Sequence, residues 1–263
     1  MDTLSSAKEA EEVSAEAACP ICKGAGFVHP RLPSGKPDYS RTIPCSCTLK
    51  AREKGRQSRL RKYSGLEAKL LQNMTFESFD REGLNPLPEQ RENLKEAFRL
   101  ALDFAKSPEG WLVFAGVNGC GKTHLAAAIA NYRLKEGQPV KFVVVPDLLD
   151  HLRSTFSPES PVSYDQLFEE VKNALLLILD DLGKQSTTPW AEEKLYQIIN
   201  HRYNHQLTTV FTTNCSLDEI SSPISSRFAD PKISVVWNIT APDYRTDATK
   251  GRKKASRTKK KPN

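Results

Sequence analysis

Residues 116–123 read Gly116-Val117-Asn118-Gly119-Cys120-Gly121-Lys122-Thr123 and satisfy the phosphate-binding pattern G-x-x-x-x-G-K-[ST] in full. The apolar run at 111–115 precedes this loop and predicts a buried strand, and a helix is expected from Lys122. Glycines let the backbone fold closely around phosphates, whose charge the N–H groups and the helix N-terminus favour. Lys122 is expected to reach the β- and γ-phosphates of ATP, and the Thr123 hydroxyl to hold Mg²⁺. The predicted nucleotide contacts are Gly116, Asn118, Gly119, Cys120, Gly121, Lys122, Thr123 and His124.

Two neighbouring carboxylates follow another apolar run, at 175–179. Asp180 lies 58 residues after Lys122 and is expected to reach the magnesium shell held by Thr123. Asp181 is the expected water-orienting base. Two surface acids that merely close a strand are the alternative interpretation. The pair therefore predicts the magnesium and hydrolysis side of the site.

Two further polar residues are candidates for the same chemistry. Asn214 ends the apolar run at 208–213, where its amide could position the attacking water beside Asp181; the alternative is a turn-forming Asn. Arg227 stands in Ser225-Ser226-Arg227-Phe228 and could be an arginine finger supplied to a neighbouring subunit. A lone arginine is more often a surface or ion-pair residue, so spacing alone leaves its role open.

Strands and helices alternate through this part of the chain. Helices are expected from Pro88, from Lys122, at 146–156, after a capping box at Ser163 and Gln166, and from Pro189. Five apolar strands with intervening helices predict an α/β fold with a parallel sheet covered on both faces. Ligands bind such sheets at the carboxyl ends of the strands. The expected strands are 111–115, 140–145, 175–179, 208–213 and 233–239.

Four of the six cysteines form a cluster near the N-terminus. Cys19, Cys22, Cys45 and Cys47 make a C-x-x-C and a C-x-C separated by 22 residues. In a chain of the cytoplasm, paired thiolates at this spacing favour a metal site over disulfides. Four soft ligands suffice for a closed, structural zinc site, and His29 is the local substitute ligand. So small a module cannot bury enough core alone, and zinc is expected to supply its fold.

Charge and composition divide the 263 residues into zones. Residues 246–263 hold eight Lys/Arg against Asp247, a net +7 compared with +6 for the whole chain. This tail either solvates the end of the chain or contacts nucleic acid. No run approaches the roughly 18 apolar residues of a membrane span, and the acidic start lacks the features of a secretory signal, so the expected location is cytoplasmic. The predicted zones are a disordered lead-in at 1–16, a zinc-binding module at 17–49, a basic helical linker and lead-in at 50–85, the ATPase domain at 86–245 and a disordered basic tail at 246–263.

Over about residues 64–245 the chain resembles the DnaC/DnaI family of bacterial replicative helicase loaders and its relative, the IstB transposase helper. The resemblance implies an AAA+ P-loop core that acts as a nucleotide switch on a hexameric replicative helicase and single-stranded DNA, assembling as a homo-oligomer. It also implies the sensor role for Asn214 and the finger role for Arg227. The N-terminal zinc module is similar in kind to the DnaI side of the family. The motifs that carry the resemblance are Ser64-Gly65-Leu66, Thr75-Phe76-x-x-Phe79, residues 119–126, Asp147-Leu148-Leu149, residues 179–183, residues 200–203, Thr212-Thr213-Asn214 and Ser226-Arg227.

Two departures from general AAA+ proteins matter. Asp181 stands where those proteins place Glu after the Walker B aspartate, and the shorter side chain fits slow, switch-like hydrolysis. Little chain follows Ile239, so the usual helical lid with its sensor arginine is expected to be absent, and Arg245 is a poor substitute.

Three functions compete on these grounds. The leading hypothesis is an ATP-dependent helicase loader, with residues 17–62 selecting the helicase. The alternative is an IstB-like transposition helper that selects target DNA. A free-standing zinc and nucleic-acid binding module with a degenerate ATPase is disfavoured, because Lys122, Thr123, Asp180 and Asn214 are all present.

Overall fold

The computed structural model describes residues 19–84, 86–157, 163–183 and 188–245. The chain divides into two compact units, residues 1–56 and 57–263, and each is described by itself. The zones predicted to be disordered, 1–16 and 246–263, lie outside the described residues. No helix among the described residues is long and apolar enough to span a membrane.

The smaller unit is built around a short hairpin. Strand β1 (Phe27–Val28) pairs antiparallel with β2 (Ile43–Pro44), and an isolated bridge joins Arg31 to Pro37. Helix α1 (Ser46–Ser64) begins directly after the hairpin and ends in the larger unit. Few residues are buried here, and two of them are Cys22 and Cys45. The four cysteines therefore occupy the place of a hydrophobic core.

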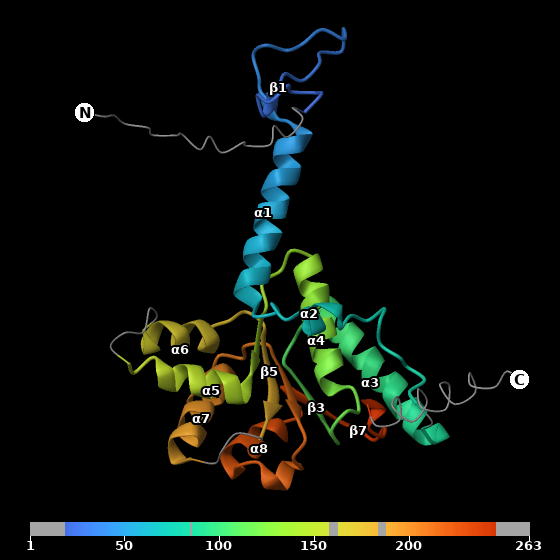
Figure 1. The fold of residues 1–263 in the computed structure, drawn as a ribbon, viewed down its shortest axis with the longest axis vertical. Helices are drawn as coiled ribbons and strands as arrows, with labels where there is room; N and C mark the ends of the chain where they lie inside the picture. The colour runs from blue at the N-terminus through green and yellow to red at the C-terminus, as the bar shows by residue number, and fades with distance from the viewer. Residues whose placement is uncertain (1–18, 85, 158–162, 184–187, 246–263) are drawn as a thin grey trace, which may run out of the picture. The chain divides into compact units, whose positions relative to one another are not determined.

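The larger unit contains a five-stranded sheet in the order β4-β5-β6-β3-β7, with every neighbouring pair parallel (Figure 1). This confirms the predicted parallel sheet. In sequence order β3 is the first strand of this sheet, and it lies between β6 and β7. The chain therefore leaves β3 toward one edge of the sheet and later adds β7 on the other side of β3. Such a switch point is where ligands bind in open α/β sheets. The strands are β3 (Trp111–Gly116), β4 (Lys141–Val144), β5 (Leu177–Leu182), β6 (Thr209–Thr213) and β7 (Ser234–Ile239).

Helices cover both faces of this sheet (Figure 1). On one face α3 and α4 pack against alternate residues such as Leu112 and Phe114, and on the other α5 to α8 pack against Trp111 and Val113. Pro88 and Pro189 open their helices as expected, and the Ser163 hydroxyl accepts from the Gln166 backbone N–H. The helices are α2 (Lys69–Asn73), α3 (Pro88–Lys106), α4 (Lys122–Lys135), α5 (Val145–Ser154), α6 (Tyr164–Lys172), α7 (Pro189–Asn204), α8 (Ser222–Phe228) and the 3₁₀ turn η1 (Leu217–Glu219).

Strand β5 differs from its prediction. Asp180 and Asp181 lie inside the strand, whereas the sequence predicted that they would follow its end. The pairing with β6 shifts register between Leu179 and Leu182, and Asp181 has a left-handed φ of 58°. A β-bulge of this kind redirects a side chain without ending the strand. The irregularity turns Asp181 toward the end of the sheet where the phosphate-binding loop lies.

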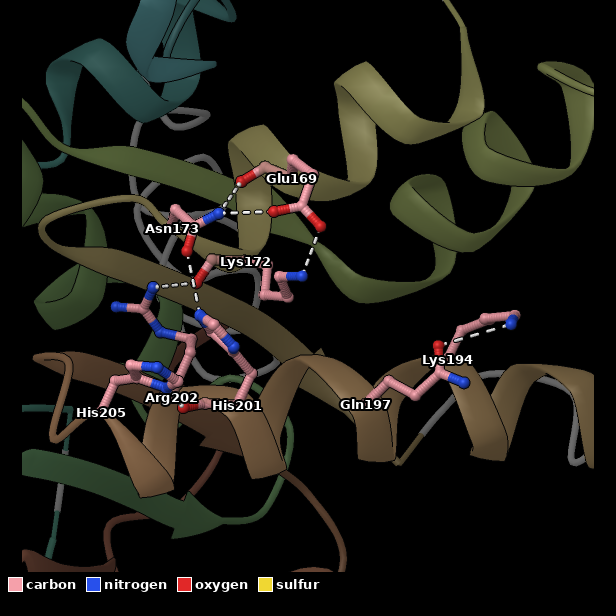
Figure 2. Close-up of polar contacts among 8 residues, drawn as sticks. All are labelled: Glu169, Lys172, Asn173, Lys194, Gln197, His201, Arg202 and His205. Carbon is pink, nitrogen blue, oxygen red and sulfur yellow. Dashed lines mark hydrogen bonds and ion pairs between the residues drawn. The ribbon is translucent and has the colours of Figure 1, made fainter.

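Polar contacts join the end of α6 to α7 (Figure 2), and Arg202 extends them to the first residue of β6. Arg202 on α7 is fully buried and donates to the carbonyls of Lys172, Ala174 and Thr208 and to the hydroxyl of Thr209. Burial lowers the pKa of Arg202 to about 9. All four of these acceptors are neutral oxygens, so fixed dipoles satisfy the guanidinium in place of a carboxylate. The arginine inside the family motif at 200–203 therefore has a structural role.

The segment before α3 belongs to the larger core. Leu66 is fully buried, and Met74, Phe76 and Phe79 pack against the layer made by α3 and α4. The Asn131 amide of α4 donates to two carbonyls of this segment, those of Leu71 and Met74. Residues 66–84 and 86, hereafter the lead-in strap, thus pack with the core of the larger unit, whereas the sequence analysis places them in the lead-in before the domain predicted at 86–245.

Candidate nucleotide-binding site

The phosphate-binding loop joins β3 to α4 and depends on its glycines. Gly116, Gly119 and Gly121 have φ values of 143°, 74° and 107°. A Cβ at Gly116 would lie 2.4 Å from the Ile239 carbonyl oxygen, and one at Gly119 would overlap the Asp243 carboxylate. The left-handed backbone of Gly119 and Gly121 disfavours larger residues there, and the nearby carbonyl excludes them at Gly116.

Lys122 lies under this loop and is almost completely buried. Its ammonium group donates to the carbonyls of Gly116, at 2.8 Å, and Val117, at 2.7 Å. The Cys120 sulfur is 3.8 Å away, and burial raises the pKa of that thiol. A fixed cation surrounded by loop backbone is the arrangement that binds phosphate oxygens.

Thr123 and Asp180 meet at the C-terminal end of the sheet. The Thr123 hydroxyl lies 3.0 Å and 3.1 Å from the two carboxylate oxygens of Asp180, and the Thr212 hydroxyl donates to the same carboxylate at 2.6 Å. Burial raises the pKa of Asp180, an effect that the Thr212 hydrogen bond opposes. A hydroxyl beside a buried carboxylate is an oxygen donor set that fits Mg²⁺. Thr212, which the sequence did not single out, fixes the orientation of this carboxylate.

Asp181 and Asn214 face each other beside this pair. The Asn214 amide nitrogen lies 3.5 Å from an Asp181 carboxylate oxygen, and the Asp181 backbone N–H donates to the Thr212 hydroxyl. Both side chains line the same cavity as Lys122 and Thr123. The structure thus brings together the residues that the sequence predicted for water positioning.

The cavity has a volume of about 390 Å³ and a second wall that the sequence did not predict. The lead-in strap, Leu94 of α3 and the residues after β7 supply it. Because the phosphate side is polar and this side is largely apolar, the cavity fits a nucleotide with its base on the apolar wall. Arg245, judged a poor sensor from sequence, lines the cavity as well. The prediction that the helical lid is absent concerns the chain after Ile239, most of which lies outside the described residues. The second wall consists of Leu70, Met74, Ser78, Phe79, Asp80, Gly83, Leu84, Pro86, Leu94, Ala241, Pro242, Tyr244 and Arg245.

His124 lines the cavity but makes its polar contacts with the strap. Its Nε2 atom lies 3.0 Å from the Thr75 carbonyl oxygen and 3.2 Å from the Ser78 hydroxyl, and its ring meets Phe79 edge-on at 5.1 Å. Burial lowers the pKa of His124, which favours the neutral ring. The residue joins the first turn of α4 to the wall of the cavity.

Arg227 is not among the residues that line this cavity. Its guanidinium lies over the rings of Tyr196 and Tyr203, at 5.1 Å and 5.3 Å, and donates to the Asn200 side chain and the Pro223 carbonyl. Within one chain Arg227 therefore joins α8 to α7. The predicted contact between Arg227 and a γ-phosphate would therefore involve the nucleotide of another subunit.

In the smaller unit the four cysteine sulfurs lie within 4.8 Å of one another. Cys19 and Cys45 are 3.9 Å apart and Cys22 and Cys47 are 3.4 Å apart. Thiolates bound to one tetrahedral zinc at about 2.3 Å lie roughly 3.8 Å from each other. The backbone N–H of Gly26 lowers the pKa of Cys22 to about 6, which favours the thiolate. The geometry fits the predicted zinc ligands.

Helix α6, helix α7 and the turn after α5 carry a group of aromatic residues, of which the sequence predicted only Tyr164 and Phe168, as the inner face of a helix. Phe156 stacks on Tyr164 at 5.3 Å, Tyr164 stacks on Phe168 at 5.4 Å, and Trp190 meets Phe156 edge-on. Phe156 is 60% exposed. Three cations lie over these rings: Arg153 over Trp190, Lys172 over Phe168 and Lys194 over Tyr164. Phe156, Tyr164, Phe168 and Trp190 with these cations are called the aromatic surface below.

Comparison with known proteins identifies the relatives of this chain. The replicative helicase loader DnaC of Escherichia coli (strain K12) is 30% identical over 164 residues, which cover 61% of this chain and 63% of the relative. The chain thus spans less than two thirds of that relative's length. The crystal structure of DnaI covers 71% of this chain and all of its own, with a TM-score of 0.55 at 24% identity. That of the DnaC helicase loader covers 66% of this chain and all of its own, with a TM-score of 0.54 at 25% identity.

These likenesses confirm the predicted AAA+ P-loop core and the resemblance to DnaC-type proteins. A family model described as IstB-like ATP binding protein matches residues 46–235, well over half of the chain. The matched range contains the phosphate-binding loop, both aspartates, Asn214 and Arg227. The chain belongs to the IstB-like ATP-binding protein family.

Proposed function

We propose that this protein is an ATP-dependent loader that uses ATP binding and slow hydrolysis to control delivery of a hexameric replicative helicase onto single-stranded DNA. ATP binding is supported by one observation: Lys122, Thr123 and Asp180 lie together at one end of the sheet. Lys122 would bind the β- and γ-phosphates, and Thr123 with Asp180 would hold Mg²⁺. Bound magnesium would neutralise phosphate charge. Asp181 and Asn214 would then orient the attacking water.

The helicase part of the proposal is supported by the relatives named replicative helicase loader and by the smaller unit. Zinc held by Cys19, Cys22, Cys45 and Cys47 would make that unit rigid, so docking would cost little conformational entropy. Large apolar side chains remain exposed around it, beyond what a small monomer needs. We assign this exposed set to helicase contact. Its members are Ile21, Phe27, Leu32, Tyr39, Ile43 and Leu49.

Single-stranded DNA is assigned to the aromatic surface. Proteins that bind single strands without sequence preference combine stacking rings with cations that contact the backbone. Phe156, which is largely exposed, would stack on a base, and Arg153, which lies over Trp190, would contact the backbone. Phe156→Ala should weaken single-strand binding about tenfold, since stacking contributes about 1–3 kcal/mol per base. Leu175→Ala, which removes another exposed apolar side chain, is the control. Equal affinities for the two variants would remove the aromatic surface from the proposal.

The whole proposal is tested with the full chain and the replicative helicase of the same organism. We expect helicase retained on closed circles of single-stranded DNA to increase when the chain and ATP are present, and to fall with Lys122→Ala. Phe27→Ser with Tyr39→Ser should reduce helicase capture while ATP binding is kept.

The alternative is an IstB-like transposition helper, which the family description favours. If the chain captures a transposase from its native host and never the helicase, the loader proposal should be abandoned for this one.

A further inference from the structure

Helix α1 carries a charge that neither the nucleotide site nor the aromatic surface uses. Between Ser46 and Ser64 it holds seven Lys/Arg and one acidic residue, Glu53, a net +6. All seven basic side chains are exposed. The ion pair between Arg56 and Glu53 within the helix is 3.7 Å long and solvent-exposed, so it contributes little stability.

The basic residues lie in two rows on opposite sides of the helix. With 3.6 residues per turn, Lys50, Lys54 and Arg61 fall on one side. Arg52, Arg56 and Arg59 follow the i, i+4, i+7 spacing on the other, and Lys62 lies between the rows. A charged helix that served only for solubility would not need this separation into two rows.

The rest of the helix excludes several kinds of partner. Leu60 packs partly against the core at the C-terminal end, but the residues between 49 and 59 form no apolar stripe. Membrane-surface helices and helices that dock in protein grooves both need such a stripe. No aromatic residue occurs between 46 and 62, so this stretch offers no stacking platform for unpaired bases. Two rows of exposed cations fit a partner that presents anionic groups on two sides, as the two phosphate backbones of a duplex do.

We propose that α1 is a binding element for duplex DNA, with each row of basic residues contacting one phosphate wall of the major groove. A helix with its side chains is about 10–12 Å across, and the groove is about 12 Å wide. Binding of this kind is independent of sequence and is driven by counterion release. The element is distinct from the aromatic surface, which we assign to single strands.

The test uses the full chain, tail included, in a salt titration of binding to a labelled duplex and to one of its strands. Lys50, Lys54 and Arg61 are changed to Gln in one variant, and Arg52, Arg56 and Arg59 in another. Each variant should bind the duplex about tenfold more weakly at low salt, and the slope of log affinity against log salt should flatten by about 0.9 for each phosphate that is no longer neutralised. Single-strand affinity and ATP binding should change little.

Controls separate this element from overall charge and from folding. The matched variant changes three exposed lysines outside α1, Lys36, Lys106 and Lys232, to Gln and should bind the duplex like the parent. Gln is a good helix former, so circular dichroism should be unchanged. If both rows can be neutralised with no change in duplex affinity, or if the matched variant is weakened as much, the assignment is overturned. Equal losses of affinity for duplex and single strand would also overturn it. Helicase capture is scored separately with the Phe27→Ser and Tyr39→Ser changes, so a failure of this inference and a failure of the loader proposal can be told apart.

Discussion

Lys122 is the residue on which we expect nucleotide binding to depend most. Its buried ammonium already has two carbonyl partners in the loop, so it is held in place before a phosphate arrives. Lys122→Ala should weaken ATP binding about a hundredfold, because charge-assisted hydrogen bonds to phosphate contribute about 1.5–3 kcal/mol each. Titration calorimetry measures this change, with Lys106→Ala as a surface control. ATP binding at parental strength would contradict the assignment of the loop.

Arg227 is expected to act on the site of a neighbouring subunit, since within its own chain this residue of α8 packs against Tyr196 and Asn200 of α7. Arg227→Ala should bind ATP normally and hydrolyse it poorly. Asp181→Asn should show the same behaviour for a different reason, the removal of the water-orienting carboxylate. Mixing the two variants should restore part of the activity, because some interfaces then pair an intact Asp181 with an intact Arg227. Mixed assemblies without any recovered hydrolysis would leave Arg227 with its role between α7 and α8 alone.

Single residues also show why the sequence predicted one wall of the site and not the other. Lys122 and Thr123 belong to a contiguous pattern whose spacing is set by the phosphates, so the sequence carries the signal directly. Phe79, Tyr244 and Arg245 come from segments far apart in the chain, and only tertiary packing brings them to one cavity. Thr212 could have been found, since it stands one strand away from Asp180 in the motif that includes Asn214.

At the scale of elements, helix starts were easier to predict than strand ends. Pro88 and Pro189 mark first turns, where a missing N–H costs nothing. The end of β5 was misplaced because acidic residues usually leave a buried strand. Here the Thr212 hydroxyl accepts from the Asp181 N–H and the strand continues through a bulge. A side-chain partner on the neighbouring strand thus overrides the polarity of the sequence.

The cysteine cluster is the element whose stability we expect to depend on a ligand. Cys22→Ser should abolish stoichiometric zinc and unfold the smaller unit, because structural zinc in finger peptides binds with about 10–16 kcal/mol. ATP binding should survive, since the nucleotide cavity lies in the larger unit. Metal analysis of protein kept in reducing buffer measures the change, and Cys215→Ser should retain the metal. A metal-free chain that stays folded with four freely reactive thiols would contradict the zinc assignment.

At the scale of the whole molecule, the charge of the tail at 246–263 is expected to add DNA affinity that depends on salt. Its eight Lys/Arg can release counterions, and each phosphate contact steepens the salt dependence on single strands by about 0.7. Deleting 246–263 should flatten that dependence and leave ATP binding unchanged. Anisotropy titrations at several salt concentrations measure both. A salt dependence that survives the deletion would reduce the tail to a solubilising end.

The lead-in strap is expected to decide where an autonomous nucleotide-binding domain can begin. A fragment starting at residue 86 would lack Leu66, Phe76 and Phe79, uncovering the apolar side of α3 and α4 and opening one wall of the cavity. Such a fragment should aggregate and bind nucleotide weakly, whereas one starting at Gln57 should stay monodisperse and bind as the full chain does. Size-exclusion chromatography with nucleotide titration compares the two, and equal behaviour would contradict the packing described.

The same packing has a consequence for evolution. The strap looks in sequence like a tether between two modules, where insertions and deletions are usually tolerated. Its main-chain carbonyls are held by Asn131, and His124 contacts the Thr75 carbonyl. Adding or removing one residue would shift every later contact along α4. Recombination that exchanges front modules between related chains should therefore leave its junctions upstream of Leu60, within α1, where most side chains are exposed and a changed length displaces no wall of the nucleotide cavity.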